Sequence, residues 1–251
     1  MLRLIILTSI CFLLSVILFF NSFIGSVKAD YTIFFAGRIP YGKSLDDWAK
    51  VYWQWSVTTP SLGEIPKDPK THLDACIVGS DPDELMIFLF NGYGEMYAAR
   101  CTISSQKPIL VPLLIGECDS SLEDDPRVKT GNIKDLWECA KDVDEEFYSW
   151  DVTLDDMILF KKSGNIKVNL DLKQEILVRN STIFPLNFPI GNRYDVPAGS
   201  YPAVVDGYYL ILKPLPSGEH ILKYKITHKK DSPGPNLSYI NGDVTYHFIV
   251  K

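Results

Sequence analysis

Side chains suited to acid–base catalysis are few in this sequence. It contains four histidines, His72, His220, His228 and His247. His220 follows a turn and begins an alternating segment in the inward-facing phase, so we expect a half-buried histidine with local partners. His247 alternates with Tyr246 and Phe248 and is expected to face away from the core.

Motifs for the common catalytic mechanisms are also missing from the sequence. It has no G-x-S-x-G elbow, no H-E-x-x-H helix, no phosphate-binding glycine loop and no dinucleotide fingerprint. No catalytic residue is therefore predicted, and the protein is expected to bind rather than catalyse. A hydrolase remains the alternative, with an acid/base pair formed by His220 or by a carboxylate cluster.

Carboxylates gather in three short clusters, of which the first contains Asp81, Asp83 and Glu84. Oxygen-rich loops suit calcium, which takes six to eight oxygen ligands and is plentiful outside cells. However, none of the clusters has the spaced D-x-D-x-D-G pattern of a calcium loop. The favoured interpretation is solvated acidic surface. Calcium at Asp81, Asp83 and Glu84 is kept as the metal hypothesis, and no other cofactor is predicted.

Aromatic residues make up 12% of the chain, and the stretch "WAKVYWQW" holds three tryptophans. Trp48, Tyr52 and Trp55 recur at helical spacing, so we expect them to pack into a core. Trp53 lies off that stripe and, if exposed, is the better ligand contact. Exposed rings stack on sugars, and Tyr201, Tyr208 and Tyr209 near a turn are further candidates of this kind. The ligand-contact candidates are thus Trp53, Tyr208, Tyr209 and His220.

The N-terminus indicates an exported protein. Arg3 precedes an apolar run from Leu4 to Phe20, and Val27 and Ala29 fit the small-residue pattern of a signal-peptidase site. Residues 1–29 are therefore predicted to be a signal peptide. The alternative is an uncleaved anchor, since the run approaches the length that spans a bilayer. Either way the protein is expected to be secreted or held at the cell surface.

Four cysteines follow this segment: Cys76, Cys101, Cys118 and Cys139. An even number in an exported chain predicts two disulfides. Three pairings exist, and we favour Cys76–Cys101 with Cys118–Cys139 because each closes a modest loop. A zinc site is the less favoured alternative, since the paired C-x₂₋₄-C spacing of zinc ligands is missing.

The charge of the chain limits its partners. The net charge of −6 argues against nucleic acid, which requires a basic footprint, and against docking on an anionic membrane. Contact with a membrane is expected only through the N-terminal segment. Two N-x-[ST] sequons, at Asn180 and Asn236, mark candidate glycosylation sites.

Hydrophobic periodicity predicts a mainly β protein. Ser44 is a good N-cap for a helix over residues 45–56, and a second helix is expected over 133–147. Asn91-Gly92 predicts a hairpin between strands at 85–90 and 96–103. Alternation over 216–227 and 243–250 indicates strands with one buried face. Residues 30–251 are therefore predicted to form one antiparallel β-sandwich, jelly-roll or Ig-like, with both helices inserted in its N-terminal half.

Several segments together resemble a group of exported bacterial and archaeal proteins. They are "LDDWAKVYWQW", "DAC", "MIFLF", "ARCTI", "KPILVPLL", "VVDGYYLILKPLPSGEHILKYK" and "DVTYHFIV", and the resemblance covers most of residues 44–251. It implies export and a single shared architecture. It implies no activity and no site residue, because no established activity is known for the group.

These observations lead to one hypothesis and two alternatives. The protein is expected to be a secreted or cell-surface binding protein for an extracellular glycan or another surface protein. An exported hydrolase and a structural envelope subunit are the alternatives, because a β-sandwich can host all three roles.

Overall fold

The structure is a computed structural model, and Thr32–Lys251 form one compact unit in it. It describes residues 33–34, 39–59, 76–90, 96–121, 128, 131–145, 147–163, 176–179, 181–228 and 243–251. The predicted signal peptide or anchor and the sequons at Asn180 and Asn236 lie outside these residues and stay predictions. No helix within these ranges has the length and apolar character needed to cross a membrane.

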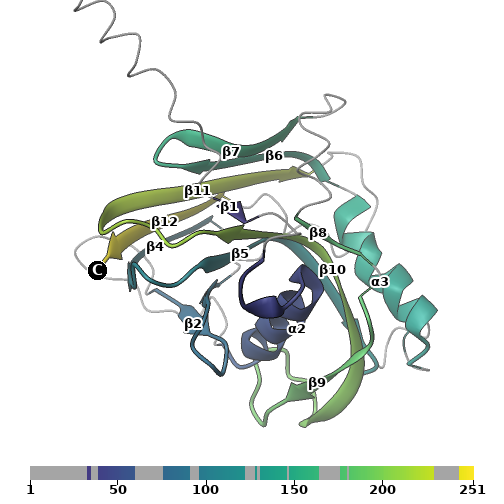
Figure 1. Cartoon of the computed structure of the whole chain (residues 1–251). Helices are drawn as coiled ribbons and strands as arrows, with labels where there is room; N and C mark the ends of the chain where they lie inside the picture. Colours follow the sequence, from purple (N-terminus) through teal and green to yellow (C-terminus); the bar gives the residue numbers. More distant parts are fainter. Residues whose placement is uncertain are drawn as a thin grey trace, which may run out of the picture. The chain divides into compact units, whose positions relative to one another are not determined.

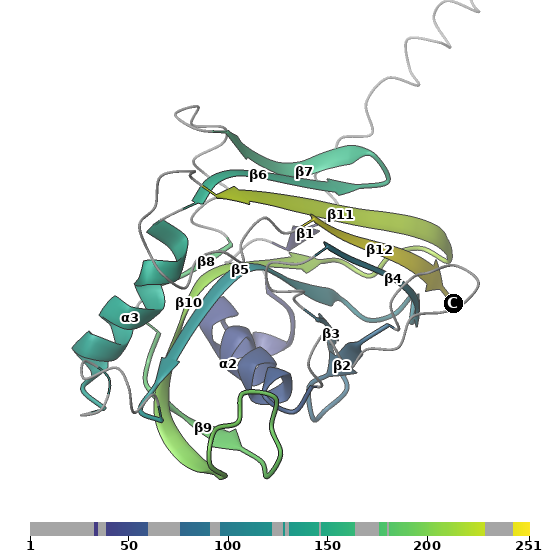
Figure 2. The same ribbon diagram turned by 180° about the vertical axis from the view of Figure 1, so that it is seen from behind.

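The described strands form two mixed sheets that are not closed (Figures 1 and 2). Sheet A has seven strands: β1 (Ile33–Phe34), β10 (Gly199–Leu212), β5 (Ile109–Asp119), β3 (Ile87–Leu89) and β2 (Val78–Ser80), with β8 (Leu177–Val178) and β9 (Phe184–Phe188) also paired to β10. Sheet B has five, in the order β4 (Met96–Ile103), β12 (Asp243–Val250), β11 (Gly218–His228), β6 (Phe147–Leu154) and β7 (Met157–Ser163).

The predicted mainly β chain with two α-helices is confirmed, but purely antiparallel pairing is wrong. β3 pairs in parallel with β5, and β12 pairs in parallel with β4. The expected hairpin between residues 85–90 and 96–103 does not form, because β3 lies in sheet A and β4 in sheet B. The chain crosses to the other sheet after β3 and returns with β5, so β3 and β5 run in the same direction.

Strand β10 is the central element of sheet A. It pairs antiparallel with β5 from Ala203↔Asp119 to Leu212↔Ile109. The register shifts between Tyr208 and Tyr209, where Pro112 cannot donate a backbone hydrogen bond and the Tyr209 amide instead donates to the Ile176 carbonyl at 2.8 Å. Gly207, next to this bulge, has φ +122°, and a Cβ there would lie 2.7 Å from Ile115 Cα. Only glycine fits this position.

Both faces of sheet A are covered. One face shares a large core with sheet B, formed by alternate residues such as Tyr208 and Leu210 of β10 and Tyr224 of β11. Beyond the edge of sheet B, helix α3 (Ile133–Glu145) packs Leu136 and Ala140 against β5 and β10. Helix α2 (Leu45–Ser56) covers the opposite face (Figure 2).

Helix α2 begins where the sequence predicts. The Asp47 amide donates to Ser44 Oγ at 3.1 Å, and the Ser44 amide donates to Asp47 Oδ2 at 3.0 Å. These bonds form a capping box, which satisfies two amides at the start of the helix. The Ser44 side-chain and backbone hydrogen bonds also lower the pKa of Asp47.

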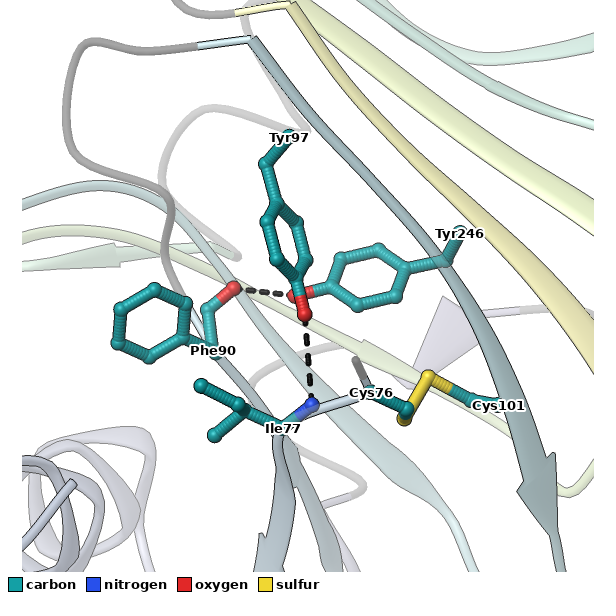
Figure 3. Close-up of a disulfide and its surroundings, with 6 residues drawn as sticks. All are labelled: Cys76, Ile77, Phe90, Tyr97, Cys101 and Tyr246. Carbon is teal, nitrogen blue, oxygen red and sulfur yellow. Dashed lines mark hydrogen bonds between the residues drawn. A yellow bond between two sulfur atoms is a disulfide. The ribbon is translucent and has the colours of Figure 1, made fainter. Parts of the chain in front are cut away.

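A covalent and polar link joins the two sheets at β4 (Figure 3). Cys76, just before β2, forms a disulfide with Cys101 of β4. The Tyr97 hydroxyl accepts from the Ile77 amide at 3.3 Å, and the Tyr246 hydroxyl donates to the Phe90 carbonyl. Two tyrosines of sheet B therefore satisfy backbone groups beside sheet A inside the core, where an unpaired polar group is costly.

The second disulfide joins Cys118 of β5 to Cys139 of α3 and fastens that helix to sheet A. Both pairings are those favoured from the sequence. Disulfides persist in oxidising compartments, so the two bonds are consistent with an extracellular protein.

Gly207→Ala should destabilise the protein by about 3 kcal/mol or more, because the methyl group adds a clash with β5 to the strain of a positive φ. Gly191→Ala is the matched control, since Gly191 has φ +72° but no atom within 4 Å of its Cβ position. We expect it to cost only about 1 kcal/mol. Urea denaturation gives the free energy of unfolding of both variants. Equal losses would show that the close approach of β10 to β5 does not exclude a side chain at position 207.

Candidate functional site

The aromatic residues predicted to contact a ligand are buried. Trp53 is 5% exposed and its Nε1 donates to the Tyr209 hydroxyl at 2.9 Å. Tyr209 is fully buried, and burial raises its pKa well above the usual value. Tyr208 is 2% exposed and packs edge-on against Trp150, with the ring centroids 4.1 Å apart. In these positions the three rings present no face on which a sugar can stack.

Trp53 is buried because the apolar stripe of α2 is wider than the stripe inferred from Trp48, Tyr52 and Trp55. Ala49 and Trp53 lie on a neighbouring row and are buried too. Residues of β3, β5, β9 and β10 surround α2, and a helix enclosed in this way buries more than one row of residues. Tyr201 is partly exposed, but its hydroxyl donates to the Pro197 carbonyl at 3.0 Å and its ring contacts Phe188.

The carboxylates considered for calcium point to different partners. Asp81 is buried and accepts from the Leu85 and Met86 amides, each at 2.8 Å, so it organises its own loop. Asp83 lies 3.9 Å from Lys43, and Glu84 lies 3.3 Å from Lys107. In the part of the chain that the structure describes, no group of three or more candidate metal ligands comes together. The arrangement therefore does not support calcium at this loop.

A hollow of about 420 Å³ lies on sheet B, and we take it as the candidate site. It spans β4, β12 and β11 and reaches the turn between β6 and β7. Its lining consists of Arg100, Asp155, Asp156, Glu219, His220, Ile221, His247, Phe248 and Ile249. Among these, His220 is the residue that was predicted to contact a ligand.

Strand alternation places most of these side chains on the outer face of sheet B. Tyr246, Phe248 and Val250 of β12 are buried in the core, so His247 and Ile249 between them point outward. This agrees with the orientation expected for His247. His247 is in register with Arg100 of β4 on one side and with Ile221 of β11 on the other. Residues in register share a face, so these three side chains are neighbours.

The next row along the same face runs from Glu219 of β11 to Ile249 of β12. Ile221 and Ile249 thus give the hollow an apolar part, and charged or hydrogen-bonding groups surround it. Small-ligand sites commonly combine apolar surface with a few polar groups that fix orientation.

The turn beside the hollow is held by His220. Asp155 and Asp156 have φ values of 49° and 62°, as a type I′ hairpin turn requires. Asp155 Oδ1 accepts from the Ile221 amide at 2.8 Å, and Asp155 Oδ2 lies 2.6 Å from His220 Nδ1. His220 Nε2 lies 3.0 Å from the Pro216 carbonyl oxygen. A carbonyl only accepts, so Nε2 carries a proton and donates it to this bond.

His220 is therefore a satisfied, half-buried histidine, as the sequence indicates. Both of its nitrogens are engaged, so neither is free to act as a general base on a substrate. The pair fastens the β6–β7 hairpin to the start of β11.

The remaining charges of the hollow divide into paired and unpaired groups. Asp155 pairs with His220, and Asp156 Oδ1 lies 3.7 Å from Lys223 Nζ. Arg100, Glu219 and His247 have no hydrogen-bond or ion-pair partner among the described residues. The hollow therefore offers a ligand the carboxylate of Glu219, the guanidinium of Arg100 and the imidazole of His247.

A second group of ionisable residues, not expected from the sequence, lies inside sheet A. Glu117 and Asp119 occupy alternate positions of β5 and share a face. Glu117 is half-buried as a residue, but its Oε1 is buried and has no hydrogen-bond partner. Burial, and then the negative charge of Asp119, raise the pKa of Glu117 well above its usual value. The pair belongs to the buried scaffold of sheet A.

Comparison with protein-family models, with curated proteins and with solved structures finds no match to this chain. The resemblance to exported bacterial and archaeal proteins therefore stays a prediction, and the functional argument rests on the site itself.

Glu117→Gln should make the protein less sensitive to alkaline pH. Below pH 4.5, the usual pKa of a glutamate, Glu117 is protonated in the folded and unfolded chains alike. Above pH 4.5 the unfolded chain releases the Glu117 proton while the folded chain retains it. The folded protein therefore loses stability as the pH rises, until the pH passes the raised pKa of Glu117 in the folded state. Unfolding free energies measured between pH 4 and pH 9 should therefore show Glu117→Gln gaining stability relative to the wild type.

The control for this measurement is Glu219→Gln, which removes an exposed carboxylate from sheet B. Its stability should follow the wild-type pH dependence. If Glu117→Gln does the same, Glu117 does not hold its proton in the folded protein.

Proposed function

We propose that this is an exported binding protein and that the hollow on sheet B holds an extracellular glycan. The observation that carries the proposal is the convergence of Arg100, His247 and Glu219 around Ile221 and Ile249, with no partner for their side chains among the described residues. Sugar hydroxyls both donate and accept hydrogen bonds. Arginine supplies donors, glutamate supplies acceptors, and a neutral histidine supplies one of each.

The dimensions of the hollow support a small or oligomeric polar ligand. Its volume of about 420 Å³ falls in the range of roughly 300–1,000 Å³ typical of ligand sites. The floor lies on paired strands, which hold their side chains more firmly than a loop does. Sheet B therefore supplies a preformed surface.

Export and location belong to the same proposal. The N-terminal segment acts as a signal peptide or as an anchor, and the disulfides Cys76–Cys101 and Cys118–Cys139 are suited to an oxidising compartment. The protein is then secreted or displayed at the cell surface, where Asn180 and Asn236 are candidate glycosylation sites. The two sheets sharing one core would be a variant of the β-sandwich, related to the jelly-roll or Ig-like types.

The hydrolase alternative is less well supported. Its acid/base pair was expected at His220 or in a carboxylate cluster. Both nitrogens of His220 are bound, one to Asp155 and one to the Pro216 carbonyl. Among the described residues that line the hollow none is a serine or a cysteine, and the carboxylates of Asp155 and Asp156 lie against His220 and Lys223.

A second candidate function, binding to another surface protein, is favoured by the loop between β9 and β10. Ile190 at its tip is 93% exposed, whereas Asn192 is buried and holds the loop in place. Asn192 Nδ2 donates to the Pro189 carbonyl at 2.9 Å, and Asn192 Oδ1 accepts from the Tyr194 amide at 3.1 Å. A rigid loop that exposes an aliphatic side chain is suited to anchor in a pocket of a partner.

Two variants separate these functions. Ile249→Trp places a large ring in the hollow without changing its charge, and Ile190→Ala shortens the exposed loop residue while leaving the hollow intact. Calorimetric titration with a panel of soluble oligosaccharides should show saturable binding to the wild type and to Ile190→Ala. We expect Ile249→Trp to weaken it at least tenfold, which is about 1.4 kcal/mol.

Binding that survives in Ile249→Trp would exclude the hollow as the site. A panel that produces no saturable binding to the wild type would remove the glycan proposal and leave the partner-protein function as the better supported one. Thermal unfolding checks that both variants are folded.

A further inference from the structure

The charges that remain free in the hollow are of opposite sign. His220 lies against Asp155 and Lys223 lies near Asp156, so two of the three acids lining the hollow already have basic partners. Within the described part of the chain, the Glu219 carboxylate and the Arg100 guanidinium have no ion-pair partner. Both side chains are exposed, and they do not form an ion pair with each other. A ligand that used both would need a cation at one end and an anion at the other.

The register fixes where these two groups stand. Glu219 of β11 lies opposite Ile249 of β12, and Arg100 of β4 lies opposite His247 of β12. The two residues are therefore separated by one intervening strand, β12, and by two residues along it. With strands about 4.8 Å apart and a rise of about 3.3 Å per residue, their Cα atoms are about 12 Å apart. Both side chains are long enough to turn toward a ligand lying between them over Ile249.

We infer that the hollow takes a glycan unit that carries both an ammonium and a carboxylate group, with the ammonium at Glu219 and the carboxylate at Arg100. This inference rests on the proposed glycan-binding function and names the class of sugar. The guanidinium offers two parallel N–H donors to a carboxylate, and Glu219 accepts N–H bonds from an ammonium. His247, beside Arg100, adds a ring nitrogen that can donate to the same carboxylate or to a neighbouring hydroxyl.

Sugars with one charge or none match this pair less well. A neutral sugar leaves both charges bound only to water. A purely acidic sugar gains Arg100 but brings its negative charge close to Glu219, Asp155 and Asp156, and an amino sugar without a carboxylate gains Glu219 but leaves Arg100 unused. The zwitterion is the one type among the four that meets both free groups with the opposite charge.

Four monosaccharides test the two charges separately. Muramic acid carries an ammonium and a carboxylate, N-acetylmuramic acid only the carboxylate, glucosamine only the ammonium, and glucose neither. Titrations of full-length protein followed by NMR chemical shifts measure weak binding to all four. We expect muramic acid to bind most tightly, with about a fivefold loss for each missing charge, since a partly exposed ion pair contributes up to about 1 kcal/mol.

Variants assign each charge to its residue. Glu219→Gln should lower the affinity for muramic acid and glucosamine about fivefold and leave that for N-acetylmuramic acid unchanged or higher. Arg100→Gln should lower the affinity for muramic acid and N-acetylmuramic acid and leave glucosamine unchanged. Lys225→Gln is the control, because it removes an exposed charge from β11 at a position that does not line the hollow.

The outcomes distinguish this inference from the function on which it rests. If glucose binds as tightly as muramic acid and Ile249→Trp abolishes both, the hollow is a sugar site but the inference about charge is wrong. If muramic acid is preferred but neither Glu219→Gln nor Arg100→Gln changes the preference, the assignment of the two charges is overturned. If none of the four sugars and no oligosaccharide binds, the proposed function fails and the inference fails with it.

Discussion

The fold depends on the antiparallel pairing of β10 with β5. This ladder runs from Ala203↔Asp119 to Leu212↔Ile109, and every residue of β10 in that range is buried. One face of the ladder forms the core shared with sheet B and continues under α3, while the other packs against α2. At Gly207 the two backbones approach so closely that a side chain would not fit. Because β10 buries apolar side chains on both faces of the sheet, unfolding would expose more apolar surface here than at a strand with one buried face.

Sheet B is attached to this frame through its inner face, which leaves its outer face available. Alternate residues of β4, β11 and β12 enter the shared core, and Tyr97, Tyr246 and the disulfide Cys76–Cys101 tie the sheet to segments beside sheet A. The residues between them point outward and contribute little to the core. Arg100, Glu219 and His247 are therefore free to serve a ligand, on a surface that the core holds in a fixed register.

Local sequence patterns were sufficient for several parts of the fold. Short-range rules predict the capped helix at 45–56, the alternating strands at 216–227 and 243–250, and the two disulfides. The structure has the helix at Leu45–Ser56, the strands at Gly218–His228 and Asp243–Val250, and both disulfides. Local patterns do not show which of the two sheets a strand joins. The turn-like Asn91-Gly92 favoured a hairpin, whereas burial of apolar strands on two different sheets decided the pairing of β3 and β4.

The site was harder to predict than the fold. His220 and His247 could be placed because histidines are rare and their phase in a strand is clear. Arg100 and Glu219 resemble any other charged residue on a solvated strand face, and only the register of β4, β12 and β11 shows that they flank one hollow. Trp53 attracted attention as an aromatic residue off the main stripe, but the hydrogen bond to Tyr209 and the width of the buried face of α2 place it in the core.

The most direct test of the account is to locate where a bound sugar lies. Backbone amide shifts of the isotope-labelled protein, recorded during titration with muramic acid, report which residues sense the ligand. We predict the largest changes at Arg100, Glu219, His247 and Ile249, with little change at Ile190 and Tyr194 of the β9–β10 loop. Saturable shifts confined to that loop, or to any surface away from sheet B, would contradict the assignment of the hollow as the binding site.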